Sequence, residues 1–331
     1  MTLLRTLCSL RRPDRSKALP LSVICQLLMV FLGAGVAAHA SSDNLLPSMH
    51  EFEKVSADGR TVFGLLIDND SLLLKKEDGF YTSGNQLSFG KALTTSSQSI
   101  TYGARIGQDL YTASDIKLRP EQISSTDHPY AGWLYGGVFR ETSDASGQGS
   151  RLSLDIGCLG ACAGGEWTQN HLHRLLNQPL PQAWSTQLQQ EWGAVLAAVW
   201  SPSRWVLNQN LDVSPRLKAR LGNIFTDASL DVTARLGQLS QLPLQPASYV
   251  FLRGEMKVVG YNATLQGGYF ANQSLAIGPR RSVGELELGY QWQSASYGLS
   301  ASVLSRSSEI NELSHSVGAQ NFARLNFHYA M

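Results

Sequence analysis

The feature that most constrains the fold of this chain is a two-residue alternation of apolar and polar side chains. In the C-terminal segment one side is apolar and aromatic: Ala323, Leu325, Phe327, Tyr329 and Met331. The other side is polar: Arg324, Asn326 and His328. Successive side chains of a β-strand point to opposite faces, so this pattern predicts a strand with two different surroundings. Repeated segments of about ten residues with this alternation are typical of barrels that face lipid outside and water inside.

The same pattern predicts twelve strands, the even number expected for a single-chain bacterial barrel. They are 58–69, 83–93, 98–111, 131–142, 149–158, 188–200, 209–221, 226–238, 247–260, 282–292, 295–306 and 320–331. Residues 261–270 could form a further strand but are assigned to a loop. The long loops on one rim are 112–130, 159–187, 261–281 and 307–319. The expected fold is all-β, a twelve-stranded antiparallel transmembrane β-barrel. A soluble β-sandwich is the alternative.

The N-terminus has the features of an export signal. A basic region precedes an apolar run from Leu19 to Ala38, and Ala38-His39-Ala40 matches a cleavage site. A transmembrane anchor is the alternative, because the run is nearly long enough to span a bilayer. We expect residues 1–40 to be a signal peptide and residues 41–331 to be one outer-membrane barrel domain.

The charge of the remaining chain argues against nucleic-acid binding. The first 40 residues hold five of the 27 basic and one of the 26 acidic residues. The remainder therefore holds 22 basic and 25 acidic residues, a net charge of −3. A nucleic-acid-binding surface is normally basic. The expected location is the bacterial outer membrane, and the expected state is a monomer.

Two cysteines lie outside the signal, in the glycine-rich segment Gly157–Gly165. Cys158 and Cys162 are four residues apart, and an exported protein meets an oxidising compartment. A disulfide is the favoured interpretation. A metal site is the alternative, although two further soft ligands are missing.

One segment breaks the β-pattern and predicts a helix at 166–176. Leu172, Leu175 and Leu176 make an apolar stripe at helical spacing. Gln169 and His173 are four residues apart and share a neighbouring polar face. A polar helix face that carries a histidine, placed against a barrel wall, suggests a catalytic site in a long outer loop.

Polar clusters interrupt three other apolar segments. Asp68-Asn69-Asp70 lies in an otherwise apolar strand, where an unpaired carboxylate is costly, so the cluster needs a cation or a wet lumen. Tyr81–Gly84 begins a strand with hydroxyl and carbonyl oxygens, which are hard ligands. Thr126–Trp133 enters a strand, and a tight structural turn is its favoured interpretation.

Together these motifs resemble the outer-membrane lipid A 3-O-deacylase family (LpxR). The resemblance depends on their order along the chain: Asn69-Asp70, Tyr81–Gly84, Asp127–Trp133, Gln169–His173 and Trp184–Leu188. It extends over about residues 60–331. It implies a twelve-stranded barrel and Ca²⁺-dependent hydrolysis of the 3′-acyloxyacyl ester of lipid A.

The resemblance also implies roles for individual residues. His173 matches the family's catalytic histidine, and Asn69, Thr82 and Gln169 match its other catalytic positions. The implied metal ligands are Asp70, Asn69 and Thr82. Lys117 and Arg119 are what remains of a basic pair that would bind substrate.

The chain departs from the family pattern at several positions. A family glutamate between the histidine and the tryptophan is replaced near Pro179. The family's usual Asp-Arg-Pro is Asp127-His128-Pro129, and cysteines stand where proline is more usual before the helix. These changes concern substrate specificity more than the type of reaction.

The residues are chemically consistent with ester hydrolysis. A histidine can deprotonate water near neutral pH, and Ca²⁺ can polarise a carbonyl. No G-x-S-x-G motif is present, which argues against a serine α/β-hydrolase. The alternatives are another barrel lipid hydrolase, such as a phospholipase, and a porin-like barrel without catalysis. The lipid substrate would reach a site on the outer barrel surface near the loop rim.

Overall fold

The computed structural model describes residues 46–73, 79–271 and 275–331. The chain divides into residues 1–48 and residues 49–331, and every helix and strand described lies in the second part. The predicted signal peptide, residues 1–40, lies outside the described residues. None of the described helices combines the length and apolar composition needed to span a bilayer.

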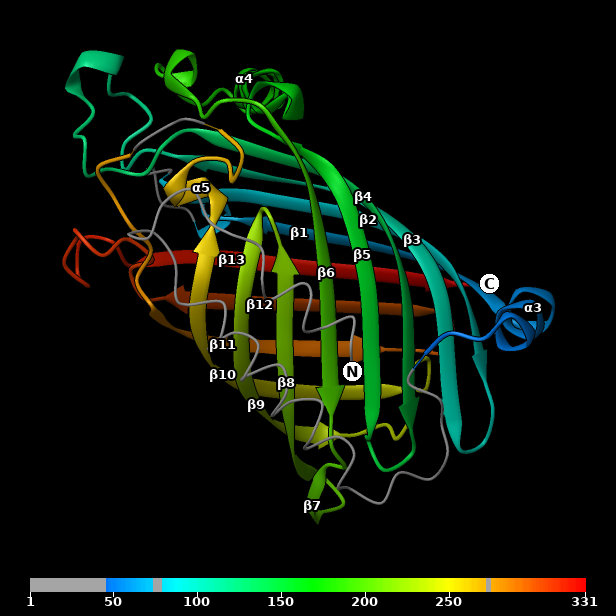
Figure 1. Cartoon of the computed structure of the whole chain (residues 1–331). Helices are drawn as coiled ribbons and strands as arrows, with labels where there is room; N and C mark the ends of the chain where they lie inside the picture. The colour runs from blue at the N-terminus through cyan, green and yellow to red at the C-terminus, as the bar shows by residue number, and fades with distance from the viewer. Residues whose placement is uncertain (1–45, 74–78, 272–274) are drawn as a thin grey trace, which may run out of the picture. The chain divides into compact units, whose positions relative to one another are not determined.

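Twelve long strands and one short strand form a single antiparallel sheet (Figure 1). The strands are β1 (Arg60–Asn69), β2 (Phe80–Thr94), β3 (Gln98–Thr112), β4 (Ala131–Asp144), β5 (Gly149–Leu159), β6 (Glu191–Ser201), β7 (Trp205–Asn208), β8 (Leu211–Gly222), β9 (Phe225–Gln238), β10 (Ala247–Asn262), β11 (Ser282–Gln293), β12 (Tyr297–Arg306) and β13 (Gln320–Ala330). Each of the twelve strands expected from alternation is present, with its ends moved by a few residues. The twelve-stranded barrel prediction is confirmed.

The sheet closes on itself at two pairings. β1 pairs with β13, and β6 pairs with β8. The short strand β7 was not predicted. It extends the edge of β8, where Trp205 is opposite Val213, beyond the stretch that β6 occupies. β6 and β8 pair over Val195–Trp200 and Leu217–Gly222, and this closure reduces the tendency of the strand edges to pair with other chains.

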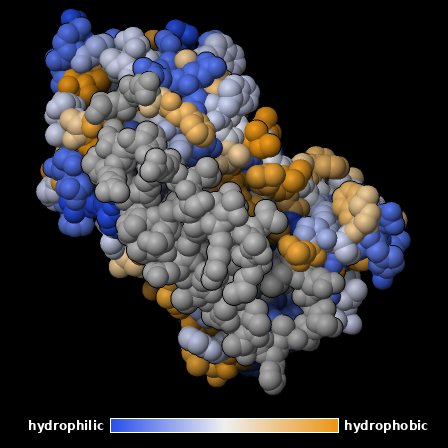
Figure 2. All heavy atoms as spheres, viewed as in Figure 1, coloured by the Kyte–Doolittle hydropathy of each residue, from blue (hydrophilic) through white to orange (hydrophobic). Residues whose placement is uncertain are grey.

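The outer wall is apolar, as the alternation predicts. Residues opposite one another in the sheet face the same side, and Leu87, Ile106, Gly136 and Ile156 form one such row across β2–β5. Leu87 is 58% exposed and Ile156 is 57% exposed. In Figure 2 hydrophilic residues gather at the long-loop end, and hydrophobic residues lie further along the flank where grey atoms do not cover it.

The inner face is filled by ion pairs. Asp68 of β1 accepts two hydrogen bonds from Arg324 of β13, each 2.7 Å long. Other pairs run along the inner wall between adjacent or next-but-one strands: Arg105–Asp155, Lys218–Asp231, Arg235–Asp212, Arg253–Glu287 and Arg306–Glu285. Paired charges of this kind satisfy side chains that would be costly to bury alone. The lumen therefore holds an interlocked polar network.

The two ends of the barrel differ. Short turns join the strands at one end, where α3 (Met49–Asp58) lies (Figure 1). Glu51 of this helix accepts hydrogen bonds of 2.6 and 2.8 Å from Arg140, and this contact lowers the pKa of Glu51. The sequence interpretation missed α3. The long loops at the other end hold η1 (Ser71–Leu73), η2 (Pro120–Gln122), η3 (Ala161–Ala163), α4 (Gly165–Leu175), η4 (Trp184–Thr186) and α5 (Ala263–Gln266).

Candidate functional site on the outer wall

The helix α4 turns its polar face toward the barrel. Gln169 is 2% exposed and His173 is 4% exposed, whereas Leu175 is 81% exposed. The helix begins after Gly164, whose φ of +67° lies in the left-handed region that favours glycine. The predicted helix is therefore confirmed to within one residue at each end. Its apolar stripe points outward, and its glutamine and histidine are the buried residues.

Trp184 holds the first half of this helix. Its indole N–H donates a 2.9 Å hydrogen bond to Oε1 of Gln169. A side chain at Gly165 would come within 2.6 Å of the same indole ring, so the helix lies directly against it. Tyr130 contacts the other side of Trp184 with a centroid separation of 5.1 Å. Tyr130 and Trp184 form a buried cluster with Leu110, Ala113 and Ala183. The cluster fixes the position of Gln169.

The imidazole of His173 is oriented by a backbone carbonyl. Its Nδ1 lies 2.5 Å from the oxygen of Pro179. A carbonyl only accepts hydrogen bonds, so Nδ1 carries the proton and Nε2 carries the lone pair in the neutral ring. His171 is different: it is exposed, and its Nδ1 contacts the carbonyl of Trp167 at 2.7 Å. The two histidines thus face opposite sides of α4.

Two neighbouring rows of the outer wall beside this helix each contain two polar residues. Asn69, Ser83, Leu110 and Gly132 are opposite one another on β1–β4. Gly132 lies against Ala163, just before α4, which places the row on the outer wall. The next row contains Ile67, Asn85, Gln108 and Leu134.

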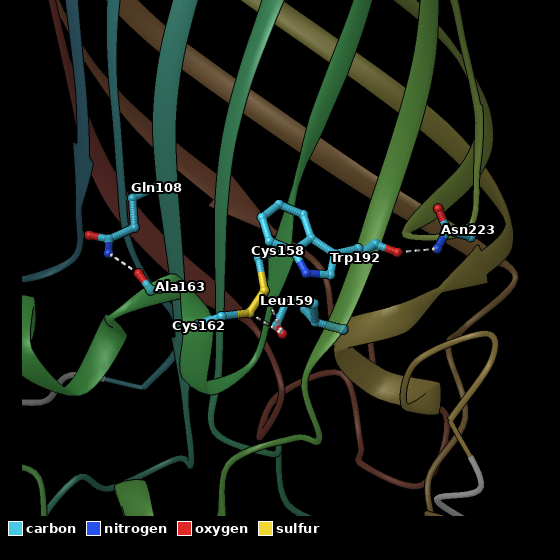
Figure 3. The surroundings of a disulfide bond; sticks show 7 residues. All are labelled: Gln108, Cys158, Leu159, Cys162, Ala163, Trp192 and Asn223. Carbon is cyan, nitrogen blue, oxygen red and sulfur yellow. Dashed lines mark hydrogen bonds between the residues drawn. A yellow bond between two sulfur atoms is a disulfide. The ribbon is translucent and has the colours of Figure 1, made fainter.

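Gln108 connects this wall to the α4 loop. Its amide nitrogen donates a 2.7 Å hydrogen bond to the carbonyl of Ala163 (Figure 3). The sequence interpretation included Ser83 in the cluster Tyr81–Gly84 but did not identify Asn85 or Gln108. Asn85 and Gln108 stand at outward positions where the alternation predicts an apolar side chain, and that mismatch was the available signal.

The predicted metal ligands meet where β1 ends and β2 begins. Thr82 is the extra residue of a bulge between Tyr81 and Ser83. Its carbonyl accepts a 3.4 Å hydrogen bond from the backbone N–H of Asp70, and its hydroxyl lies 2.8 Å from that of Thr112. Asp70 is 6% exposed, and its Oδ2 accepts from the N–H of Gly79 at 3.1 Å.

Asn69 is differently placed. Its amide oxygen accepts hydrogen bonds from both the N–H and the hydroxyl of Ser71. These bonds close a turn directly after β1. The oxygen of Asn69 therefore has a structural partner already, and a role as metal ligand stays a prediction.

A chain of contacts joins this corner to the helix. Thr112, which contacts Thr82, is followed by Ala113 of the buried cluster. Trp184 of that cluster holds Gln169, and His173 follows one turn later. The structure thus brings Thr82, Gln169 and His173 to the same end of β2 and β3, connected through packed side chains.

The two basic residues lie in the β3–β4 loop. Lys117 and Arg119 are both exposed. The carbonyl of Ile116 accepts a 2.9 Å hydrogen bond from the N–H of Gln182, so this loop is joined to the segment that follows α4. Contact of Lys117 and Arg119 with substrate stays a prediction.

The described oxygen atoms fit a calcium site only in part. Asp70 and Thr82 provide a carboxylate, a carbonyl and a hydroxyl, which are the hard ligands that Ca²⁺ prefers. Within residues 46–73, 79–271 and 275–331, no three acidic, histidine or cysteine side chains form a metal cluster. A calcium ion here would need neutral oxygens, water or substrate to complete its six to eight ligands.

The Asp127–Pro129 segment is a structural turn, as expected. Asp127 accepts hydrogen bonds from the N–H and hydroxyl of Ser114 at 2.9 and 2.6 Å. His128 is stacked on Tyr111 with ring planes 6° apart, and burial lowers its pKa. The buried ring of His128, stacked on Tyr111, supports packing of the β3–β4 loop.

A disulfide joins Cys158 and Cys162, which confirms the predicted pairing (Figure 3). Cys158 is the outward residue near the end of β5, and Cys162 belongs to the turn that leads into α4. The bond therefore ties the base of the α4 loop to the barrel wall.

We expect the variant with Cys158→Ser and Cys162→Ser to fold as a barrel with a more mobile α4. Backbone amides in residues 160–176 should exchange with deuterium faster, because the strand and the helix are no longer joined. Reductant should have the same effect on the wild type but none on the variant. Unchanged exchange in this segment would contradict the expectation.

Trp184→Phe should loosen Gln169 without removing the aromatic packing. The variant loses the indole donor and leaves the buried oxygen of Gln169 without this hydrogen bond. Such a loss costs about 1–3 kcal/mol. We expect lower thermal stability of the α4 loop and faster deuterium exchange of its backbone amides. Tyr130→Phe, which keeps the ring contact, serves as a packing control.

Comparisons with known proteins agree with this geometry. The family model described as outer membrane protein LpxR matches residues 25–331. The solved structure of LpxR from Salmonella typhimurium is 21% identical, with a TM-score of 0.69, and the match covers 82% of this chain and all of that one. The β-domain of the Bordetella autotransporter BrkA is 10% identical, with a TM-score of 0.48, over 82% of this chain and 99% of that domain. A search of curated proteins gave no match. The family match covers most of the sequence and the fold agrees, so the chain belongs to the LpxR family of outer membrane proteins.

Proposed function

We propose that this barrel is a Ca²⁺-dependent esterase that removes the 3′-acyloxyacyl group from lipid A. The observation that carries the proposal is the burial of Gln169 and His173 on the face of α4 that contacts Trp184 and Pro179. Membership of the LpxR family supports the same conclusion. A buried histidine beside polar side chains, on a surface that otherwise faces lipid, is suited to chemistry on a membrane lipid.

The surroundings of the site suit a substrate with acyl chains. The row Leu87, Ile106, Gly136 and Ile156 lies next to the polar rows and is apolar. On α4, Trp167 and Leu175 are 66% and 81% exposed. An ester held at the polar rows could therefore keep its hydrocarbon chains against apolar surface in the membrane. The exposed Lys117 and Arg119 would bind phosphate groups of lipid A from the loop side.

His173 is proposed as the general base. Nε2 takes a proton from water as the water oxygen attacks the ester carbon. The same proton then passes to the sugar oxygen as the carbon–oxygen bond breaks. The products are a free fatty acid and a free hydroxyl group. The contact between Nδ1 and Pro179 keeps the ring in the tautomer that this step requires.

Pro179 stands near the position where the family has a glutamate. In this chain the backbone carbonyl of Pro179 orients the histidine. A backbone acceptor can fix the tautomer as a carboxylate would, but it adds no charge beside the ring. The departure is therefore compatible with a working base.

Gln169 and the β1–β2 corner would stabilise the carbonyl oxygen. The Nε2 of Gln169 is buried and has no hydrogen-bond acceptor among the described residues. It can donate to the negative charge that forms during attack. Asp70 and the oxygens of Thr82 are proposed to hold Ca²⁺, with Asn69 nearby. When bound, the ion would polarise the ester carbonyl.

The number of strands disfavours the porin alternative. Twelve long strands make a narrow barrel, and ion pairs such as Arg105–Asp155 and Arg253–Glu287 line its inner wall. A wide polar channel is a feature of larger barrels. A passive barrel would also have no need for a buried histidine on its outer wall.

Mass spectrometry of lipid A tests the proposed function. Cells that produce the protein should contain lipid A lighter by one acyloxyacyl group, and cells without it should not. Release of fatty acid from phospholipid with unchanged lipid A would indicate a phospholipase. Unchanged lipids, with the folded barrel present in the outer membrane, would contradict the esterase proposal.

A further inference from the structure

A groove of about 680 Å³ lies on the outer wall across β9–β12, away from the α4 site. Its outward lining is apolar or small. These residues are Leu230, Val232, Gly254, Met256, Gly284, Leu286 and Ser305. The β12–β13 loop adds His315 and Ala319 at one end. The volume is within the range of small-molecule binding sites.

Two glycines make the groove, and packing does not require either of them. A side chain at Gly254 would meet no atom within 4 Å, and one at Gly284 would first meet an atom at 4.0 Å. In contrast, a side chain at Gly289 on the same strand would come within 2.5 Å of Phe251. Glycine weakens a strand and often marks close approach of a ligand. The open space over Gly254 and Gly284 is therefore a candidate binding site.

The strand register places both glycines on the lipid-facing side. Gly254 is opposite Leu286, and Gly284 is opposite Met256. Leu286 is 54% exposed and Met256 is 57% exposed. The inner residues behind the groove are already paired, since Glu285 accepts 2.7 Å hydrogen bonds from Arg253 and Arg306. The groove is thus an apolar recess, and the charged side chains of Glu285, Arg253 and Arg306 behind it are paired with one another.

The groove lies in the half of the wall nearest the long loops. β11 begins at Ser282 and β12 ends at Arg306, so Gly284 and Ser305 are close to the loop end of their strands. In outer-membrane barrels the longer loops are extracellular. The groove therefore faces the outer leaflet, whose lipids are glycolipids with several acyl chains.

We propose that this groove binds one acyl chain of an outer-leaflet glycolipid, with the polar headgroup beside Ser307 and His315. The groove is continuous with the apolar surface that contacts the membrane, so a hydrocarbon chain is its natural occupant. Strand β13 lies between it and the rows on β1–β4. It is a binding site distinct from the proposed catalytic site, and it does not depend on hydrolysis.

Native mass spectrometry of the purified full chain with hexa-acylated lipid A tests this site. The variant with Gly254→Leu and Gly284→Leu fills the groove from positions where a side chain has room. We expect the affinity for one bound lipid A molecule to fall about tenfold. Intact and deacylated lipid A are both counted as bound. Ala301→Leu adds a leucine side chain at an exposed position of β12 outside the groove and should bind as the wild type does. Equal occupancy in all three proteins would overturn the proposal.

Photocrosslinking keeps the proposal testable if the double variant folds poorly. Lipid A with a diazirine in one acyl chain should label peptides within 230–256 and 284–319 of the wild type. Labelling spread evenly around the barrel would overturn the site. Equal labelling of the groove by a diazirine phosphatidylethanolamine would overturn its assignment to glycolipid. Because neither readout measures ester hydrolysis, an inactive protein could still support the groove.

Discussion

His173→Ala should reduce hydrolysis of the lipid A ester by about 10²–10⁴-fold, the usual effect of losing a general base. The ring is buried on the barrel side of α4, and its Nδ1 is held by the carbonyl of Pro179. The side chain takes no part in the barrel wall, so the variant should fold and insert normally. Released fatty acid measures the reaction, and heat modifiability on gels measures the folded barrel.

His171→Ala is the matched control on the same helix. His171 is exposed, lies on the opposite side of α4, and contacts Trp167 in the first turn. We expect little change in hydrolysis. If both variants show equal and small losses, His173 is not the base. If His173→Ala lowers folded yield and activity in proportion, the residue has a structural role.

Much of this fold follows from one physical rule. A strand that separates lipid from a polar lumen must alternate, and the C-terminal segment does so without interruption. In the structure Leu325 and Phe327 face outward, and Arg324 pairs with Asp68 inside. Because each of the twelve strands obeys the same constraint, their positions could be predicted within a few residues.

Other elements have no such constraint. α3 is held at the short-turn end by Glu51 and Arg140, which are 89 residues apart. β7 has only four residues, too few for alternation to identify. Both depend on tertiary contacts that local sequence does not encode.

The candidate site was predictable in its residues and not in its geometry. Spacing alone placed Gln169 and His173 on one helix face, and the structure shows that face buried. The contact of His173 with Pro179 uses a backbone carbonyl, which no side-chain pattern reveals. The outward Asn85 and Gln108 were visible as breaks in alternation, but their meaning required the strand register.

Asp70→Asn should raise the concentration of Ca²⁺ needed for hydrolysis by at least about tenfold. The change removes the negative charge at the β1–β2 corner and keeps nearly the same shape, so the turn that holds Gly79 should persist. Ca²⁺ affinity depends on the number of charged oxygen ligands, and Asp70 is the proposed carboxylate. For the wild type, a chelator should abolish hydrolysis and added Ca²⁺ should restore it.

After chelator treatment, Mg²⁺ should restore hydrolysis by the wild type poorly, because this ion demands strict octahedral geometry and gives up water reluctantly. Asp58→Asn removes an exposed carboxylate at the end of α3, at the opposite rim, and should leave the calcium requirement unchanged. Titration calorimetry with Ca²⁺ alone provides a measurement that is independent of catalysis. Hydrolysis that persists in chelator, or the same calcium dependence for Asp70→Asn and wild type, would move the metal site away from this corner. In that case Asp70 would act only through its hydrogen bonds to the turn between β1 and β2.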